Sequence, residues 1–249
     1  HRPSFHLLAK IRKPFSLRFE THSMKHQYFD QNKEPVPSVT TIIAQLDKPY
    51  LLKWANTIGL KGYSYEGIRN KAADTGTLAH TMVENLIKGK EEDFSAHPLF
   101  VPANRSYAAF QQWFSLHDVQ FLGSEISLVN HELGYGGTID IIARVNGKIC
   151  IVDIKTSNQL CTEYHYQVAA YALLLETATL NDKGETRIFP TYSPDNALLL
   201  RLDKRDGTFQ EKWLSRDELQ LPQEIFTSLI SVFQLRKSYK NALLLQNKL

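Results

Sequence analysis

Residues 136–155 read GGTIDIIARVNGKICIVDIK, and this stretch decides the fold. Apolar residues alternate with others on both sides of Asn146-Gly147, a dipeptide that favours a two-residue type I′ turn between antiparallel strands. That turn fixes the register of the two strands, so that Asp140 lies directly opposite Asp153. Opposed residues project from the same face of a sheet, with Cβ atoms about 5 Å apart. The sequence therefore predicts a hairpin that holds two carboxylates side by side.

The two faces of this predicted hairpin differ in polarity. Lys155 shares a face with Asp153, because side chains alternate along a strand. Two opposed carboxylates repel each other, but a bound divalent cation reverses that interaction, and oxygen ligands suit Mg²⁺ or Mn²⁺. The alternative is that the acids are ordinary solvent-facing residues of a strand. The other face is expected to be core and carries Ile139, Ile141, Ala143, Val145, Cys150, Val152 and Ile154.

Outside the hairpin, hydrophobic spacing predicts a mixture of helices and strands. Helical spacing is found over residues 39–46, 49–59, 75–88, around 107–114 and over 163–177, and Pro222 opens a further helix. Segments 123–130, 138–145, 148–154, 197–202 and 208–214 predict strands. We expect Ser38 to cap the first helix, Asp74 or Thr75 to cap the third, and Gly89 to end the third. The mixture, without an internal repeat, predicts one α/β domain.

The composition excludes several classes of protein. With 249 residues, 43% of them hydrophobic and 22% charged, the chain can form a packed core, which excludes disorder over most of its length. The longest apolar run, residues 168–175, is far shorter than the ~18 to 20 residues that a membrane span requires, so we expect no membrane association. Two cysteines, Cys150 and Cys161, are too few for a disulfide framework or a four-thiolate site. We therefore expect no iron–sulfur cluster, and a reducing compartment.

The net charge of +3 belongs to the N-terminal tail rather than to the body of the chain. Residues 1–23 hold five basic side chains and one acidic side chain, whereas residues 24–249 hold 24 basic and 25 acidic ones. The total charge is therefore no argument for nucleic-acid binding. We interpret residues 1–23 as a basic tail, which is a transit peptide, a tag or upstream sequence, and residues 24–249 as a single domain. We expect an intracellular location: mitochondrial if the tail is a transit peptide, otherwise cytoplasmic in a bacterium or a phage-infected cell.

Asp140, followed thirteen residues later by Asp153-x-Lys155, resembles the signature of the PD-(D/E)XK nuclease superfamily. The resemblance implies a restriction-endonuclease-like core: an α/β fold with a central mixed β-sheet flanked by helices, together with an N-terminal helical region. It also implies that Asp140 and Asp153 bind a catalytic Mg²⁺, which Mn²⁺ could replace, with the carbonyl of Ile154 as a further ligand. Lys155 would then polarise the attacking water or stabilise charge on the phosphate. Whether Lys155 acts as a base or only through its charge stays open.

Two helical motifs make the resemblance more specific. Residues 76–80 match the Gly-x-x-x-His helix, and residues 167–171 the Gln-x-x-x-Tyr helix, of the RecB-like exonuclease branch. The size and the opening at residues 37–42 resemble the mitochondrial genome maintenance exonucleases and the small phage-encoded exonucleases. The motifs imply that His80 completes the metal shell, while Gln167 and Tyr171 orient the lysine, the water or the DNA backbone. Glu125 stands where related nucleases often carry an acid, at the start of the first strand, and we expect it to bind a second metal or to fix the other ligands by hydrogen bonding.

A region just before His80 interleaves basic with aromatic side chains, a pattern typical of single-strand binding. A folded helical pair with a solvated charged rim explains the pattern equally well. The candidate nucleic-acid contacts are Lys53, Trp54, Lys61, Tyr63, Arg69 and Lys71.

Together these features predict a metal-dependent DNA exonuclease that hydrolyses single-stranded DNA or flaps in DNA maintenance, repair or recombination. We expect it to act as a monomer, alongside replication or recombination proteins. One alternative is a structure-selective endonuclease or a nuclease module of a helicase or recombination complex. The other is a non-catalytic nucleic-acid-binding protein, which the complete set of catalytic residues disfavours.

Overall fold

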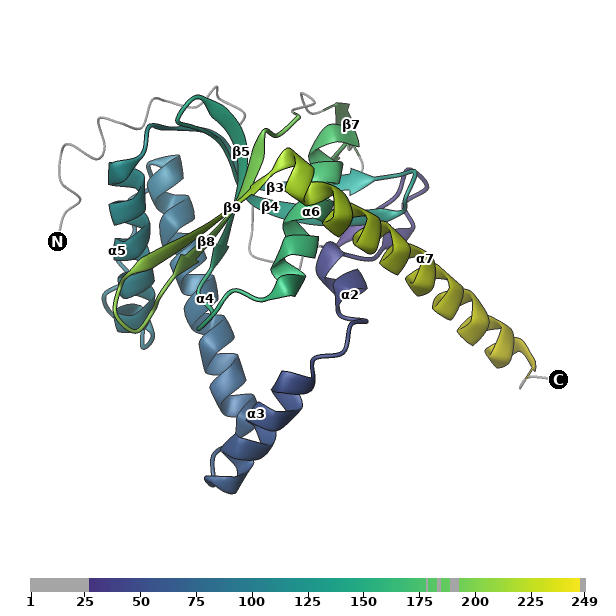
Figure 1. The fold of residues 1–249 in the computed structure, drawn as a ribbon, viewed down its shortest axis with the longest axis horizontal. Helices are drawn as coiled ribbons and strands as arrows, with labels where there is room; N and C mark the ends of the chain where they lie inside the picture. The colour runs from purple at the N-terminus through teal and green to yellow at the C-terminus, as the bar shows by residue number, and fades with distance from the viewer. Residues whose placement is uncertain (1–26, 178, 183–184, 189–192, 247–249) are drawn as a thin grey trace.

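A seven-stranded β-sheet forms the centre of the computed structural model (Figure 1). The structure describes residues 27–177, 179–182, 185–188 and 193–246, so the predicted basic tail, residues 1–23, lies outside the described residues. The strands of the sheet are β3 (Val119–Asn130), β4 (Tyr135–Val145), β5 (Lys148–Lys155), β6 (Thr179–Asp182), β7 (Glu185–Ile188), β8 (Asn196–Leu202) and β9 (Phe209–Ser215). Their order is β7-β6-β3-β4-β5-β8-β9, with β5 and β8 parallel and the other neighbours antiparallel. A separate two-stranded sheet pairs β1 (Tyr28–Phe29) with β2 (Pro35–Val36).

Helices cover both faces of the main sheet. One face packs against α4 (Tyr65–Lys88) and α5 (Phe100–Leu116), and the other against α2 (Val39–Ile43), α6 (Thr162–Thr177) and α7 (Arg216–Gln246). The predicted fold class, an α/β fold with a mixed sheet flanked by helices, is therefore confirmed. None of the helices in the described part of the chain is long and apolar enough to span a membrane.

The hairpin forms with the predicted turn and register. Asn146 and Gly147 have φ angles of 49° and 84°, as a type I′ turn requires. The paired residues run from the turn to Ile141 and Val152. Beyond that pair, the Ile154 amide donates a hydrogen bond of 2.8 Å to Asp140 Oδ2. The Asp140 carboxylate is thus fixed to the backbone of the neighbouring strand.

The predicted core face of the hairpin is confirmed, because all seven of its residues are buried. The expectation that the opposite face is polar was wrong, because helices cover both sides of the sheet. Ile142 and Ile151, on the face assigned to the acids, are fully buried in the cluster formed with α2, α6 and α7. Ile139 also belongs to this cluster, whereas Ile141 packs on the α4 and α5 side. The acids therefore lie at the end of a buried hairpin rather than on a solvent-facing surface.

Two predicted helix starts were also wrong. The Ser64 hydroxyl, rather than Asp74 or Thr75, caps α4 by accepting from the Gly67 amide at 3.1 Å. The last helix begins before Pro222, because Ser215 and Glu218 form a reciprocal capping pair, in which each side chain accepts from the other's backbone amide. The Ser38 cap and the stop at Gly89, which has a left-handed φ of 63°, are confirmed.

A helical arm projects from the body of the protein (Figure 1). It consists of α3 (Pro49–Leu60) and the first turns of α4, and we call residues 49–71 the arm. α3 has no buried residue. Trp54 packs edge-on against Tyr65 with ring centroids 5.1 Å apart, which holds the two helices of the arm together. The Tyr50 hydroxyl connects the arm to the start of α6 by a hydrogen bond of 3.4 Å to Glu163.

Candidate active site

A cleft of about 960 Å³ opens between α4, α6 and the strand ends near Glu125, Asp140 and Ile154. Seven of the predicted catalytic and metal-binding residues line this cleft: His80, Glu125, Asp140, Ile154, Lys155, Gln167 and Tyr171. Asp153 is fully buried and is not part of the lining. The fold thus brings together at one cleft residues that are far apart in the sequence.

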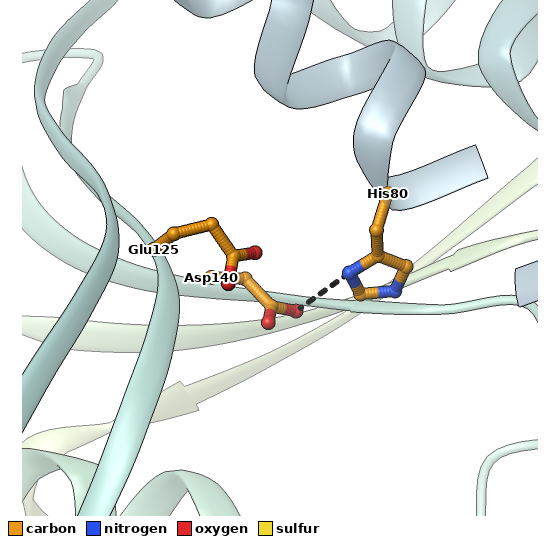
Figure 2. Close-up of side chains that lie close together, drawn as sticks. All are labelled: His80, Glu125 and Asp140. Carbon is orange, nitrogen blue, oxygen red and sulfur yellow. Dashed lines mark ion pairs between the residues drawn. The ribbon is translucent and has the colours of Figure 1, made fainter. Parts of the chain in front are cut away.

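Three of these side chains form a group that could hold a metal ion (Figure 2). His80, Glu125 and Asp140 each offer one ligand atom, and the three atoms lie within 4.8 Å of one another. His80 Nδ1 lies 3.7 Å from Asp140 Oδ2. An imidazole with two carboxylates is a donor set that suits Mg²⁺ and, with greater affinity, Mn²⁺. The group therefore contains three of the predicted metal ligands, His80, Glu125 and Asp140, and does not include Asp153.

Two local features of the backbone bring the group together. A Cβ atom at Gly76 would lie only 2.9 Å from Thr156 Oγ1, so the glycine lets α4 approach the end of β5 and places His80 over the strands. Glu125 has a φ of +52°, which is uncommon for a residue with a side chain. It lies between Ser124 and Ile126, which pair with the residues on either side of Asp140. Glu125 is thus brought next to Asp140.

The carboxylates of this group repel one another, and a bound cation would reduce the repulsion. Burial, followed by the nearby charges of Asp140 and Glu84, raises the pKa of Glu125 to about 8. A divalent ion would offset this repulsion and favour the ionised carboxylates. The residues present therefore fit a divalent metal, which His80, Glu125 and Asp140 would hold.

Asp153 and Lys155 form a buried ion pair beside the metal group. Lys155 Nζ lies 2.5 Å from Asp153 Oδ2, while Oδ1 accepts no hydrogen bond within the described ranges. Burial raises the pKa of Asp153 to about 6, although Lys155 acts in the opposite direction. Burial alone lowers the pKa of Lys155, but Asp153 and Asp140 outweigh it, and the net shift is upward. In the metal-free protein, the charges of Asp153 and Asp140 therefore favour the protonated form of Lys155.

Three residues of α6 complete the cleft wall next to Lys155. Gln167 Nε2 donates a hydrogen bond of 2.9 Å to the buried Tyr171 hydroxyl, whose pKa is raised well above its usual value by burial. The Lys155 ammonium lies 4.8 Å from the ring centre of Tyr164, a cation–π contact. Tyr164 was not among the predicted site residues, although its spacing from Gln167 and Tyr171 places all three on one helix face.

The predicted nucleic-acid contacts lie outside the cleft, on the arm. Trp54 is half-buried against Tyr65, and the Arg69 guanidinium lies 5.7 Å from the ring centre of Tyr65. The other four are exposed: Lys53, Lys61, Tyr63 and Lys71. The structure separates these residues from the metal group, and a bound strand would have to contact both regions.

Comparison with known proteins identifies the class to which this fold and site belong. Residues 50–240 match the PD-(D/E)XK nuclease superfamily, and the chain is a member of it. Members of this superfamily use divalent metals, and the match implies a nuclease. Among solved structures, the chain is similar to one described as "Crystal Structure of LHK-Exo in complex with dAMP", with 15% identity, a TM-score of 0.33, and coverage of 70% of this chain and 92% of the other. The comparison with curated proteins found no match.

Proposed function

We propose that the protein is a metal-dependent DNA exonuclease that hydrolyses single-stranded DNA or flaps from an end, in DNA maintenance, repair or recombination. The carrying observation is the group of His80, Glu125 and Asp140 beside the Asp153–Lys155 ion pair, in one cleft of a PD-(D/E)XK nuclease. We assign Mg²⁺ as the ion, with Mn²⁺ as a substitute. His80 and the Gln167–Tyr171 pair support assignment to the RecB-like branch, because the motifs that define it meet at the cleft.

The roles of the individual residues follow from their charge and contacts. A divalent ion at this site would polarise the phosphate and lower the pKa of the attacking water. Lys155, kept protonated by Asp153 and Asp140, would stabilise negative charge that develops on the phosphate. Asp153 holds the lysine in place through the 2.5 Å ion pair. Tyr164 contacts the Lys155 ammonium through its ring and limits the motion of the lysine, while the hydrogen-bonded Gln167 and Tyr171 line the same cleft.

The arm supports the requirement for a free DNA end. Tyr50 near its start bonds to Glu163 on α6, and its other end continues into the helix that carries His80. The arm therefore contacts both helices that line the cleft, α4 by continuity of the chain and α6 by this hydrogen bond. A strand that has to pass between the arm and the cleft can enter by a free end, whereas a closed circle cannot. Exposed basic and aromatic side chains on the arm provide phosphate and stacking contacts for a single strand.

Digestion of labelled DNA by the purified protein tests this proposal. The substrates are 5′-labelled and 3′-labelled linear single strands, flaps, duplexes and a circular single strand, each with Mg²⁺, Mn²⁺ or a chelator. We expect progressive shortening of linear strands and flaps from one end, intact circles, and no reaction with the chelator. Cleavage of circles would indicate an endonuclease instead. Binding without cleavage in both metals would exclude the enzymatic function.

A further inference from the structure

Among the described residues, three lysines line the cleft, Lys90, Lys155 and Lys204, and Lys204 lies apart from Lys155 at the start of the turn after β8. It lines the cleft from the turn between β8 and β9, and its Nζ lies 3.5 Å from the Ala72 carbonyl on α4. Ala72 precedes His80 by eight residues of the same helix, which corresponds to about 12 Å along the axis. Lys204 is therefore too far from the metal group to contact the same phosphate oxygen, yet it faces the same cleft.

The turn that carries Lys204 is held in one conformation. The Asp203 amide donates to the Thr208 carbonyl at 2.8 Å, and the Gly207 amide donates to the Asp203 carbonyl at 2.9 Å. Gly207 has a φ of +76°, which favours glycine at this position. Asp203 Oδ1 also accepts from the Arg205 amide at 2.8 Å. The position of Lys204 is thus set by the fold rather than by a flexible loop.

The nearest carboxylate is already occupied by two arginines. Arg201 Nη2 lies 2.5 Å and Arg205 Nη2 2.6 Å from Asp203 Oδ2, and Arg205 Nε donates to Oδ1 at 3.0 Å. Hydrogen bonds from Arg205 are the main cause of a pKa of Asp203 well below its usual range. Lys204 itself makes no ion pair with a carboxylate in the described part of the chain. Burial lowers the pKa of Lys204 and the charge of Asp203 only partly offsets this effect, so an anionic ligand would stabilise the half-buried ammonium.

We infer that Lys204 binds a phosphate group of the DNA strand in the cleft, and so sets the position of the strand relative to the metal group. The inference rests on the proposed nuclease function. The phosphate is either an internal phosphodiester or a terminal phosphomonoester, since both offer the same anionic oxygens. Thr156, next to Gly76 on the same lining, provides a hydroxyl that can donate to such a group.

The inference is tested with Lys204→Met, Lys204→Arg and a matched control, Lys148→Met. Lys148 is exposed and lies at the opposite end of β5 from Lys155, so its replacement removes the same charge away from the cleft. Fluorescence anisotropy of labelled single strands, in an Asp140→Asn background that prevents cutting, gives Kd as a function of salt. Steady-state cleavage in the otherwise native protein gives KM and kcat, and thermal unfolding checks that each variant is folded.

We expect Lys204→Met to weaken binding about tenfold, to reduce the slope of log K against log salt by about 0.7, and to raise KM more than it lowers kcat. Lys204→Arg should retain most of the affinity, and Lys148→Met should match the native chain. A loss seen only with 5′- or 3′-phosphorylated strands identifies a terminal phosphate, and a loss with every strand identifies an internal one. If Lys204→Met and Lys148→Met have equal Kd and salt slope, the inference about Lys204 is overturned, and cleavage by the native protein would still support the proposed function. Absence of cleavage by the native protein would instead defeat the proposed function.

Discussion

The end of the β4–β5 hairpin and the arm hold charged residues in opposite ways. At the hairpin, Asp153 is fully buried and its carboxylate contacts Lys155 at 2.5 Å. On the arm, α3 buries no residue, and Lys53 and Lys61 are exposed. Even the apolar side chains of Leu52 and Leu60 are 76% and 81% exposed there. Charges in a low-dielectric interior interact strongly, whereas exposed charges are screened by water and salt. Chemistry is therefore expected to depend on a few hairpin residues, and strand binding on many arm residues, each with a small effect.

The largest effect is expected from Asp140→Asn. This change removes a negative charge that the metal group shares with Glu125 and His80, and a metal centre contributes several kcal/mol to the transition state. We expect kcat to fall by about a thousandfold or more, with weaker Mn²⁺ binding in titration calorimetry. The exposed Asp217→Asn is the matched control and should keep full activity. An Asp140→Asn protein with more than a tenth of native activity would contradict the assignment of Asp140 to the metal group.

The second effect concerns the buried ion pair. Lys155→Met should lower kcat by about a hundredfold or more, because it removes the positive charge beside the phosphate. It also leaves Asp153 buried without its partner, which should lower the free energy of unfolding by about 3 kcal/mol. Adding Asp153→Asn should restore much of that stability without restoring activity. Denaturant unfolding and cleavage assays on both single variants and the double variant would separate the two roles. If stability and activity recover together, the pair acts only as a structural contact.

These two predictions depend on features that the sequence reveals to different degrees. The register of the hairpin could be predicted, because Asn146-Gly147 and the alternation of apolar residues are local signals. Asp140 and His80 could be placed at one site only through the motif resemblance, since they lie on different elements. The ion pair between Asp153 and Lys155, and the distance of Asp153 from the group of His80, Glu125 and Asp140, could not be predicted. Both depend on how deeply the end of β5 is buried by helices on both sides of the sheet.

Other parts of the site depend on contacts between distant segments. Lys204 reaches the cleft because β8 lies parallel to β5, and this pairing is not encoded in either strand alone. Glu125 was predicted as a ligand only from the resemblance to nucleases that carry an acid at this strand start, while its left-handed φ of 52° appears only in the structure. The start of α7 is different, because the Ser215–Glu218 capping pair is a visible local signal that the prediction from Pro222 overlooked.

A third prediction concerns Glu125 and the pH dependence of stability in metal-free protein. Its folded-state pKa of about 8 lies above the ordinary value of 4.5, so the fold favours the protonated form. The stability that the protonated Glu125 side chain contributes is therefore fully present below pH 4.5 and is lost as the pH rises toward 8. For each pH unit between the two pKa values, the free energy of unfolding falls by about 1.4 kcal/mol at most.

Glu125→Gln should therefore be more stable than the native chain at pH 8, by on the order of a few kcal/mol, and similar to it near pH 4.5. Urea unfolding across this range in the presence of a chelator measures the difference. Mn²⁺ should stabilise the native chain at pH 8 more than it stabilises Glu125→Gln, because only the native carboxylate can ionise and bind the ion. A stability difference that does not change with pH would show that Glu125 lacks this coupling.

The smallest effects are expected on the arm. Substitutions there test most directly whether the arm contributes only to strand binding, in contrast to the hairpin. Lys53→Ala and Lys61→Ala each remove an exposed charge, so each should raise KM for a single strand only two- to threefold, corresponding to roughly 0.5 kcal/mol, and less at high salt. Lys240→Ala on the exposed part of α7 is the matched control and should leave KM unchanged. Combining the arm substitutions should give nearly additive losses, because the residues share no partner. A single arm substitution that lowers kcat as much as Lys155→Met would mean that the arm takes part in the chemistry and does more than hold the strand.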